Sequence, residues 1–108
     1  MKLEKNNIIN LIKQNMNLFG AFDEVYVFGS ILDSEKYSND IDILLLYSNF
    51  SYGILASISS IIKCIEHLTS YPVDITALSF EEEKEVDFIG RLDKKWLCHN
   101  KWLVFDEK

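Results

Sequence analysis

Proline, glycine and arginine are scarce in this sequence of 108 residues, which has one proline, four glycines and a single arginine, Arg91. Chains rich in proline and glycine form linkers, collagen-like helices or disordered tails, and the scarcity of both excludes those classes. Long apolar runs are also missing, and the longest are far too short to span a membrane. The first residues are polar and lead into no apolar signal-peptide stretch. We therefore expect a cytoplasmic protein without a membrane partner.

Positive charge is also in short supply. Lysine and arginine together number 11 against 17 aspartates and glutamates, which gives a formal net charge of −6 and a pI of about 4.8. Binding to nucleic acid depends on a basic surface that displaces counterions from the phosphates, so we expect no nucleic-acid partner. A triphosphate bound to this chain would have to be neutralised mainly by metal ions and backbone N–H groups.

Cysteine is limited to Cys64 and Cys98, which lie far apart in the sequence. Their spacing matches no zinc-binding pattern, and we expect two reduced, buried thiols. What the chain does have is 48% hydrophobic residues, enough to build a real core. A chain of this length fits one domain, 1–108, which buries roughly two-thirds of its unfolded surface on folding.

The apolar pattern predicts alternating helices and strands along the chain. Ile8, Ile12 and Met16 recur at helical spacing, which predicts a helix over 3–18. Gly20 stands where a C′ glycine would follow such a helix. The remaining elements follow from apolar runs and from the turn residues between them.

A capping box marks the start of a later helix. Ser79 and Glu82 have the spacing of such a box, which predicts a helix that begins near Phe80 and bends or breaks at Gly90. A turn is predicted at His99-Asn100. The other predicted elements are strand 24–28, a short helix or turn from 30, loop 33–39, strand 40–47, helix 53–69, strand 73–78 and strand 101–106. This alternation is typical of an α/β fold, here a small mixed sheet with helices packed against it.

The strand 40–47 carries two carboxylates at its start. Because side chains alternate across a strand, Asp40 and Asp42 share one face with Leu44 and Leu46. Two partly buried carboxylates on one face repel each other and are costly unless a cation neutralises them. Mg²⁺ prefers oxygen ligands of this kind, and a carboxylate pair can bridge two ions roughly 4 Å apart for in-line displacement at phosphorus.

An Asp-x-Asp pair alone has a simpler interpretation. Asp40 can cap a turn and Asp42 can lie at a solvent-exposed strand end, and short motifs of this kind are common. The preceding segment favours the metal site, because an apolar strand ends there at Gly29-Ser30. Glycine lets a backbone approach a ligand closely, and a serine at a helix start offers N–H groups that suit a phosphate.

These segments together form a pattern of an apolar strand, Gly29-Ser30, nine residues and Asp40-Ile41-Asp42-Ile43. The pattern resembles the signature of the nucleotidyltransferase superfamily with the DNA polymerase beta fold. In that family a later strand supplies a third acidic residue, and Asp74, within Pro72-Val73-Asp74-Ile75-Thr76, stands in the corresponding place. The resemblance implies a nucleotidyltransferase fold of the α/β (α+β) type.

The resemblance also implies roles for these residues. Asp40 and Asp42 would hold two Mg²⁺ ions, with Mn²⁺ as an alternative, one to activate the acceptor hydroxyl and one to neutralise the triphosphate. Asp74 would ligate the first metal or accept the proton. Gly29 and Ser30 would seat the phosphates of a nucleoside triphosphate, which the resemblance implies is ATP.

The short chain is similar to one branch in particular, the minimal nucleotidyltransferases (MNT), which consist of little but the catalytic core. Many of them pair with a small helical toxin of the HEPN type in two-gene toxin–antitoxin systems. There the minimal transferase acts as antitoxin by moving AMP from ATP onto a tyrosine of the toxin. The resemblance implies this AMPylation activity and this partner for the chain, and leaves its oligomeric state open.

Two alternatives remain open. A small-molecule modifier, such as an antibiotic adenylyltransferase, usually adds a second domain that grips its substrate, and 108 residues leave no room for one. The other alternative is a catalytically degenerate module that neutralises its partner by contact. It is favoured by Ile31-Leu32-Asp33-Ser34, where basic residues and a glycine are common in the family, and by Asn39, where serine is common. Lys36 is a candidate to replace the missing basic residue, and the intact acidic trio favours the enzyme.

Overall fold

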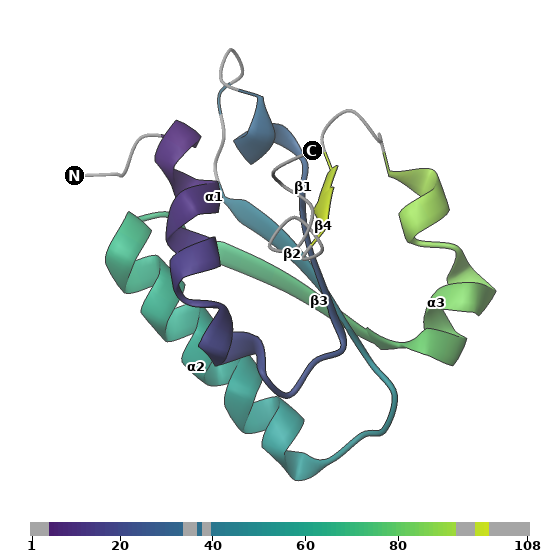
Figure 1. Cartoon of the computed structure of the whole chain (residues 1–108). Helices are drawn as coiled ribbons and strands as arrows, with labels where there is room; N and C mark the ends of the chain where they lie inside the picture. The colour runs from purple at the N-terminus through teal and green to yellow at the C-terminus, as the bar shows by residue number, and fades with distance from the viewer. Residues whose placement is uncertain (1–4, 34–36, 38–39, 93–96, 100–108) are drawn as a thin grey trace.

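The computed structural model describes residues 5–33, 37, 40–92 and 97–99 of the chain. Helices and strands alternate along it in the predicted order (Figure 1). They are α1 (Lys5–Gln14), the 3₁₀ turn η1 (Met16–Phe19), β1 (Glu24–Phe28), the 3₁₀ turn η2 (Ser30–Leu32), β2 (Ile41–Tyr47), α2 (Tyr52–Thr69), β3 (Val73–Ser79), α3 (Phe80–Val86), the 3₁₀ turn η3 (Ile89–Arg91) and β4 (Leu97–His99).

The described strands form one mixed sheet in the order β3-β2-β1-β4. β1 is antiparallel to both β2 and β4, whereas β2 and β3 are parallel. Parallel neighbours need a long crossover connection, and α2 supplies it between the end of β2 and the start of β3. The predicted fold class, a small mixed sheet flanked by helices, is confirmed.

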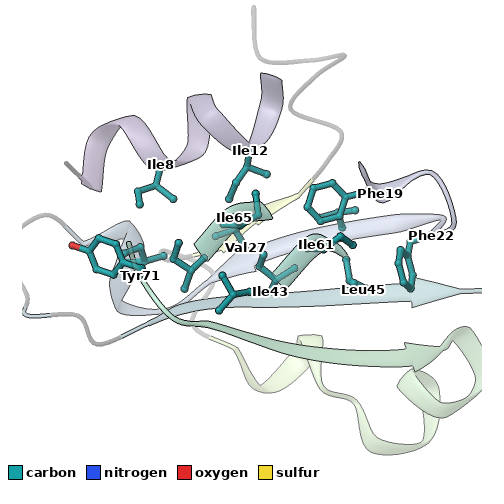
Figure 2. Close-up of a cluster of buried hydrophobic side chains, with 14 of the residues drawn as sticks. Ile8, Ile12, Phe19, Phe22, Val27, Ile43, Leu45, Ile61, Ile65 and Tyr71 are labelled. Carbon is teal, nitrogen blue, oxygen red and sulfur yellow. The ribbon is translucent and has the colours of Figure 1, made fainter. Parts of the chain in front are cut away.

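The main core lies between the sheet and the helices α1 and α2, and most of it is drawn in Figure 2. Because side chains alternate along a strand, every second residue of β1 and β2 points into this core. The buried side chains that meet there include Ile8 and Ile12 of α1, Val25 and Val27 of β1, Ile41, Ile43 and Leu45 of β2, and Ile54, Ile61 and Ile65 of α2. α2 therefore turns one apolar side toward the sheet, while its Leu55 and Leu68 are 56% and 42% exposed.

The opposite face of the sheet is covered as well. Leu44 and Leu46 point away from the main core, yet they are only 0% and 2% exposed. α3 lies on this side of the sheet (Figure 1), and the ring of Phe88, just after α3, packs edge-on against Phe28 with the ring centroids 5.6 Å apart. β2 is therefore buried on both faces, as its nearly continuous apolar sequence predicts.

α3 begins where the capping box predicts it. The Glu82 N–H donates to Ser79 Oγ at 3.0 Å, and the Ser79 N–H donates to Glu82 Oε1 at 2.9 Å. The helix ends earlier than predicted, because Asp87 adopts a left-handed conformation with φ of 51°. The break therefore falls at Asp87, and Gly90 lies within η3.

The first helix is shorter than the predicted range 3–18. Asn15 Nδ2 donates to the Leu11 carbonyl at 2.8 Å, which is the acceptor that the Asn15 N–H would use in a continuing α-helix. The Asn15 N–H donates instead to the Ile12 carbonyl, and the chain continues as the tighter turn η1. Gly20 follows that turn with a right-handed φ of −61°, so the prediction of a C′ glycine there is wrong.

The end of the chain also differs from the prediction. His99 belongs to β4, where it is paired with Tyr26, rather than to a turn. The strand predicted over 101–106 lies outside the described residues. Cys64 is a free thiol and is only partly buried. No helix in the described ranges is long and apolar enough to cross a membrane.

Candidate metal and nucleotide site

The parallel pairing of β2 with β3 brings three aspartates together. Asp42 and Asp74 are direct partners in the register, so their side chains emerge side by side on the same face. Asp40 precedes β2, and the next residue, Ile41, donates its N–H to the Pro72 carbonyl at 2.9 Å, which holds this end of the strand against β3. One carboxylate oxygen from each of Asp40, Asp42 and Asp74 lies within 4.8 Å of the other two.

Strand alternation separates these carboxylates from the main core. Val73 is buried in the core, Ile75 packs against it, and Asp74 between them is exposed on the other face. Asp40 and Asp42 are partly buried. The cluster therefore opens to solvent on the Asp74 side, where a ligand can enter, and borders the buried Leu44 on the strand that carries Asp42.

The charges in this cluster act most strongly on Asp42. Its pKa is raised from 3.8 to about 6, mainly because the carboxyl is buried and then because of the negative charges of Asp40 and Asp74. A divalent cation would remove the repulsion that contributes to this shift. Mg²⁺ binds oxygens at about 2.1 Å, so carboxylates spaced as these are need only a small closing movement to share an ion. The donor set and its spacing thus fit a hard divalent metal.

Gly29 lies directly beside this cluster. It follows Phe28, the β1 partner of Asp42, and has φ of 89° and ψ of −161°, a region that is essentially restricted to glycine. A Cβ atom at this position would lie 2.8 Å from Asp42 Oδ2, closer than side chains normally approach. Glycine is therefore required here both by the backbone conformation and by the position of the Asp42 carboxylate.

Ser30 begins η2, as the sequence predicts a short helix or turn there. The turn is closed by the Leu32 N–H, which donates to the Gly29 carbonyl at 3.1 Å. Ile31, after Ser30, is 2% exposed and belongs to the main core. The Gly29-Ser30 turn is thus anchored by apolar packing at the end of β1 next to the acidic cluster.

The single arginine has a structural position in the fold. Arg91 Nη2 donates to the Val86 carbonyl at 2.6 Å, and its Nε donates to the Asp87 carbonyl at 3.4 Å. The guanidinium therefore ties η3 to the end of α3. Lys36, the other candidate for a phosphate contact, lies outside the described residues.

Aromatic residues on the same face of the sheet were not among the predicted site residues. Phe28 pairs with Asp42 and contacts Phe88. Tyr26 donates its hydroxyl to Glu24 Oε1 at 2.8 Å, and its pKa is raised by burial, by that bond and by the charges of Glu24 and Glu83. Alternation along β1 would have assigned Phe28 to the face of Asp42 once the β1–β2 register was known, whereas no sequence signal indicates Phe88.

The family model for the nucleotidyltransferase domain matches residues 8–99 of the sequence. The chain therefore belongs to the nucleotidyltransferase domain family. The matched range includes all the residues of the site described above.

Two solved structures have a similar fold. One is a chain in the complex of tri-AMPylated HEPN toxin from Shewanella oneidensis with MNT antitoxin, with a TM-score of 0.52 and 16% identity over 91% of this chain and 71% of that chain. The other is a chain in a mutant of the toxin–antitoxin complex MntA–HpeT, with a TM-score of 0.52 and 18% identity over 91% and 73% of the two chains. At such identities the likeness shows the fold alone. No curated protein matches the sequence significantly.

Proposed function

We propose that this chain is a metal-dependent nucleotidyltransferase that moves AMP from ATP onto a tyrosine hydroxyl of a cognate small helical toxin. In this role the chain is an antitoxin of the minimal nucleotidyltransferase branch. Its membership of the nucleotidyltransferase domain family supports the class of reaction.

The observation that carries the proposal is the cluster of Asp40, Asp42 and Asp74. Three carboxylates with oxygens within 4.8 Å of one another are costly in a fold unless a cation accompanies them. Burial, and after it the charges of Asp40 and Asp74, raise the pKa of Asp42 to about 6, so this carboxylate would gain from a neighbouring cation. A structural role would be served better by uncharged side chains, so the cluster supports a binding site for a divalent metal.

Each residue of the site would have a defined task. Asp40, Asp42 and Asp74 would hold Mg²⁺ or Mn²⁺, which neutralises triphosphate oxygens and lowers the pKa of the acceptor hydroxyl. Asp74 is the most exposed of the three, and it would accept the proton of an incoming hydroxyl. Gly29 leaves the space beside Asp42 free, and Ser30 at the start of η2 would help to seat the phosphates.

Two features support a protein as the acceptor. Both solved structures described above are toxin–antitoxin complexes, and the HEPN toxin in one of them is tri-AMPylated. The net charge of −6 also suits a partner with a basic surface.

Mass spectrometry of the partner tests the proposal. The chain is incubated with ATP, Mg²⁺ and a candidate cognate toxin of the proposed small helical type. We expect the partner to gain the mass of an AMP group on a tyrosine, and to gain none in EDTA or with the Asp42→Asn variant. A partner that stays unmodified in Mg²⁺ contradicts AMP transfer.

A second candidate function is a catalytically inactive module that neutralises the partner by contact. It is favoured by the small number of basic side chains near the Gly29-Ser30 turn. Ile31, at a position where the family commonly has basic residues, packs into the core, and the only arginine, Arg91, bonds the Val86 carbonyl at the end of α3. A partner that is inhibited by the chain in the same experiment but remains unmodified supports this second function.

A further inference from the structure

An aromatic pair borders the acidic cluster on the face of the sheet that points away from the main core. Phe28 and Asp42 are direct partners across the antiparallel β1–β2 ladder, so their side chains lie on the same face with Cβ atoms about 5 Å apart. Phe88 extends this apolar border, with its ring centroid 5.6 Å from that of Phe28 and the planes at 75°. Both side chains are partly buried and partly accessible. The pair therefore forms an aromatic corner one side chain away from the carboxylates.

The segment that carries Phe88 is held firmly by its own hydrogen bonds. Asp87 turns the chain out of α3 in a left-handed conformation, and its N–H donates to the Glu83 carbonyl at 2.7 Å. The Ile89 N–H donates to Glu83 Oε2 at 2.9 Å, and Arg91 bonds the carbonyls of Val86 and Asp87. A left-handed conformation at a residue other than glycine has an energetic cost and is maintained only when the surroundings require it. These contacts fix the direction in which Phe88 leaves the chain.

We propose that Phe28 and Phe88 form the platform on which the base of the bound nucleoside triphosphate stacks, an inference that rests on the proposed function of the acidic cluster. When the phosphates lie at Asp40, Asp42 and Asp74, the base lies one ribose away from them. The aromatic corner is an apolar surface next to Asp42 at which that base can be received. Because the two rings meet edge to face, part of their surface stays free of each other. A third aromatic ring can pack there in an offset or edge-to-face arrangement.

Stacking of the base on this platform would add to the ATP affinity that the metal site gives through the phosphates. Base–aromatic stacking tolerates every base, because every base has a π-face. The phosphate-and-metal interaction and the base interaction are therefore separable by ligand: inorganic tripolyphosphate uses the first alone, whereas ATP uses both.

The test is calorimetry of the full chain with Mg²⁺–ATP and with Mg²⁺–tripolyphosphate. Phe88→Leu should weaken ATP binding about tenfold, within the usual range for loss of one base–aromatic stack, and leave tripolyphosphate binding unchanged. Phe88→Tyr keeps the ring and should bind ATP as the original chain does. The matched control is Phe50→Leu, since Phe50 is 56% exposed and follows the other end of β2. NMR should also show a contact between the adenine protons and the Phe88 ring.

Four results would overturn the platform. Unchanged ATP affinity in Phe88→Leu removes the base from this surface. An equal loss of ATP and tripolyphosphate affinity in a folded Phe88→Leu variant would mean that Phe88 acts only by positioning the carboxylates. An original chain that binds Mg²⁺–tripolyphosphate as tightly as Mg²⁺–ATP refutes the platform and leaves the metal site intact. If the original chain binds neither ligand, the proposed function fails, and the platform fails with it.

Discussion

In the acidic cluster, burial and neighbouring charge act together on Asp42. Its raised pKa means that the folded, metal-free chain holds a proton on this carboxyl between pH 3.8 and about 6, where the unfolded chain has released it. The stability that this proton contributes is complete below the unfolded value and disappears as the pH rises through about 6. Metal binding at neutral pH would replace the proton as the neutralising charge.

The first prediction follows from that linkage. In EDTA, the free energy of unfolding should fall between pH 4.5 and pH 7.5 by more in the original chain than in Asp42→Asn. After allowance for solvent screening at this partly exposed site, the difference should be on the order of 1 kcal/mol. Urea unfolding at the two pH values measures it. Equal pH dependence in the two proteins would show that Asp42 titrates normally.

The second prediction concerns Gly29, where an added methyl group should affect both stability and ATP binding. Gly29→Ala should lower the free energy of unfolding by about 1–3 kcal/mol, because alanine is strained at φ of 89° and its Cβ would displace Asp42 Oδ2. Metal-dependent ATP binding should weaken with it. Thermal unfolding and calorimetry measure the two effects.

The control for Gly29→Ala is Gly53→Ala. Gly53 lies in α2 without positive φ, and an added Cβ would meet only Ser51 Oγ at 3.5 Å, an ordinary contact. Alanine there should stabilise the helix by about 0.5–1 kcal/mol and leave ATP binding unchanged. A Gly29→Ala variant that behaves like Gly53→Ala would contradict the close approach of Gly29 to Asp42.

At the scale of elements, the pairing of β2 with β3 decides what the acidic cluster contains. α2 carries the chain back so that β3 runs parallel to β2, and the shared register sets Asp74 opposite Asp42. An antiparallel or shifted β3 would have moved Asp74 away or turned it toward the core, since a shift of one residue exchanges the two faces of a strand.

The prediction for this element concerns Asp74→Asn. The change keeps the size of the side chain but removes a base, so AMP transfer to the partner should fall by at least about a hundredfold. ATP binding should survive, because Asp40 and Asp42 remain. Glu85→Gln removes an exposed carboxylate on α3 and serves as the control with normal transfer. Normal transfer by Asp74→Asn would remove Asp74 from the catalytic group.

Elements with strong local signals could be predicted from the sequence. The capping box of Ser79 and Glu82 gives the first residue of α3, and the apolar run after Asp42 identifies β2 as a strand buried on both faces. The end of α3 at Asp87 could not be predicted, because it depends on how Glu83 and Arg91 bond the segment that follows. Gly20 is not the C′ residue of α1, because the Asn15 side chain ends that helix before Gly20 is reached.

The candidate site shows the same division between local and distant signals. Asp40 and Asp42 lie two residues apart on one strand, so their shared face follows from alternation alone. The contact of Phe28 with Phe88 joins residues far apart in sequence through packing of the α3–η3 segment on the sheet, and no local pattern reports it.

At the scale of the whole molecule, the sheet has the hydrophobic core on one face and the candidate site on the other. The face covered by α1 and α2 holds the main core (Figures 1 and 2). The acidic cluster and the Phe28–Phe88 pair lie on the other face. Substitutions in the cluster can therefore change metal and nucleotide binding without emptying the core. The net charge of −6 makes a bound cation the natural partner for a triphosphate on this surface.

The central claim is that the three aspartates form a metal site that binds a nucleoside triphosphate, and calorimetry with ATP tests it most directly. The original chain should bind ATP in Mg²⁺ or Mn²⁺ and show little binding in EDTA. Asp42→Asn should remain folded and lose the effect of the metal. Equal ATP affinity with and without metal, or an Asp42→Asn variant that still responds fully to Mg²⁺, would contradict the claim.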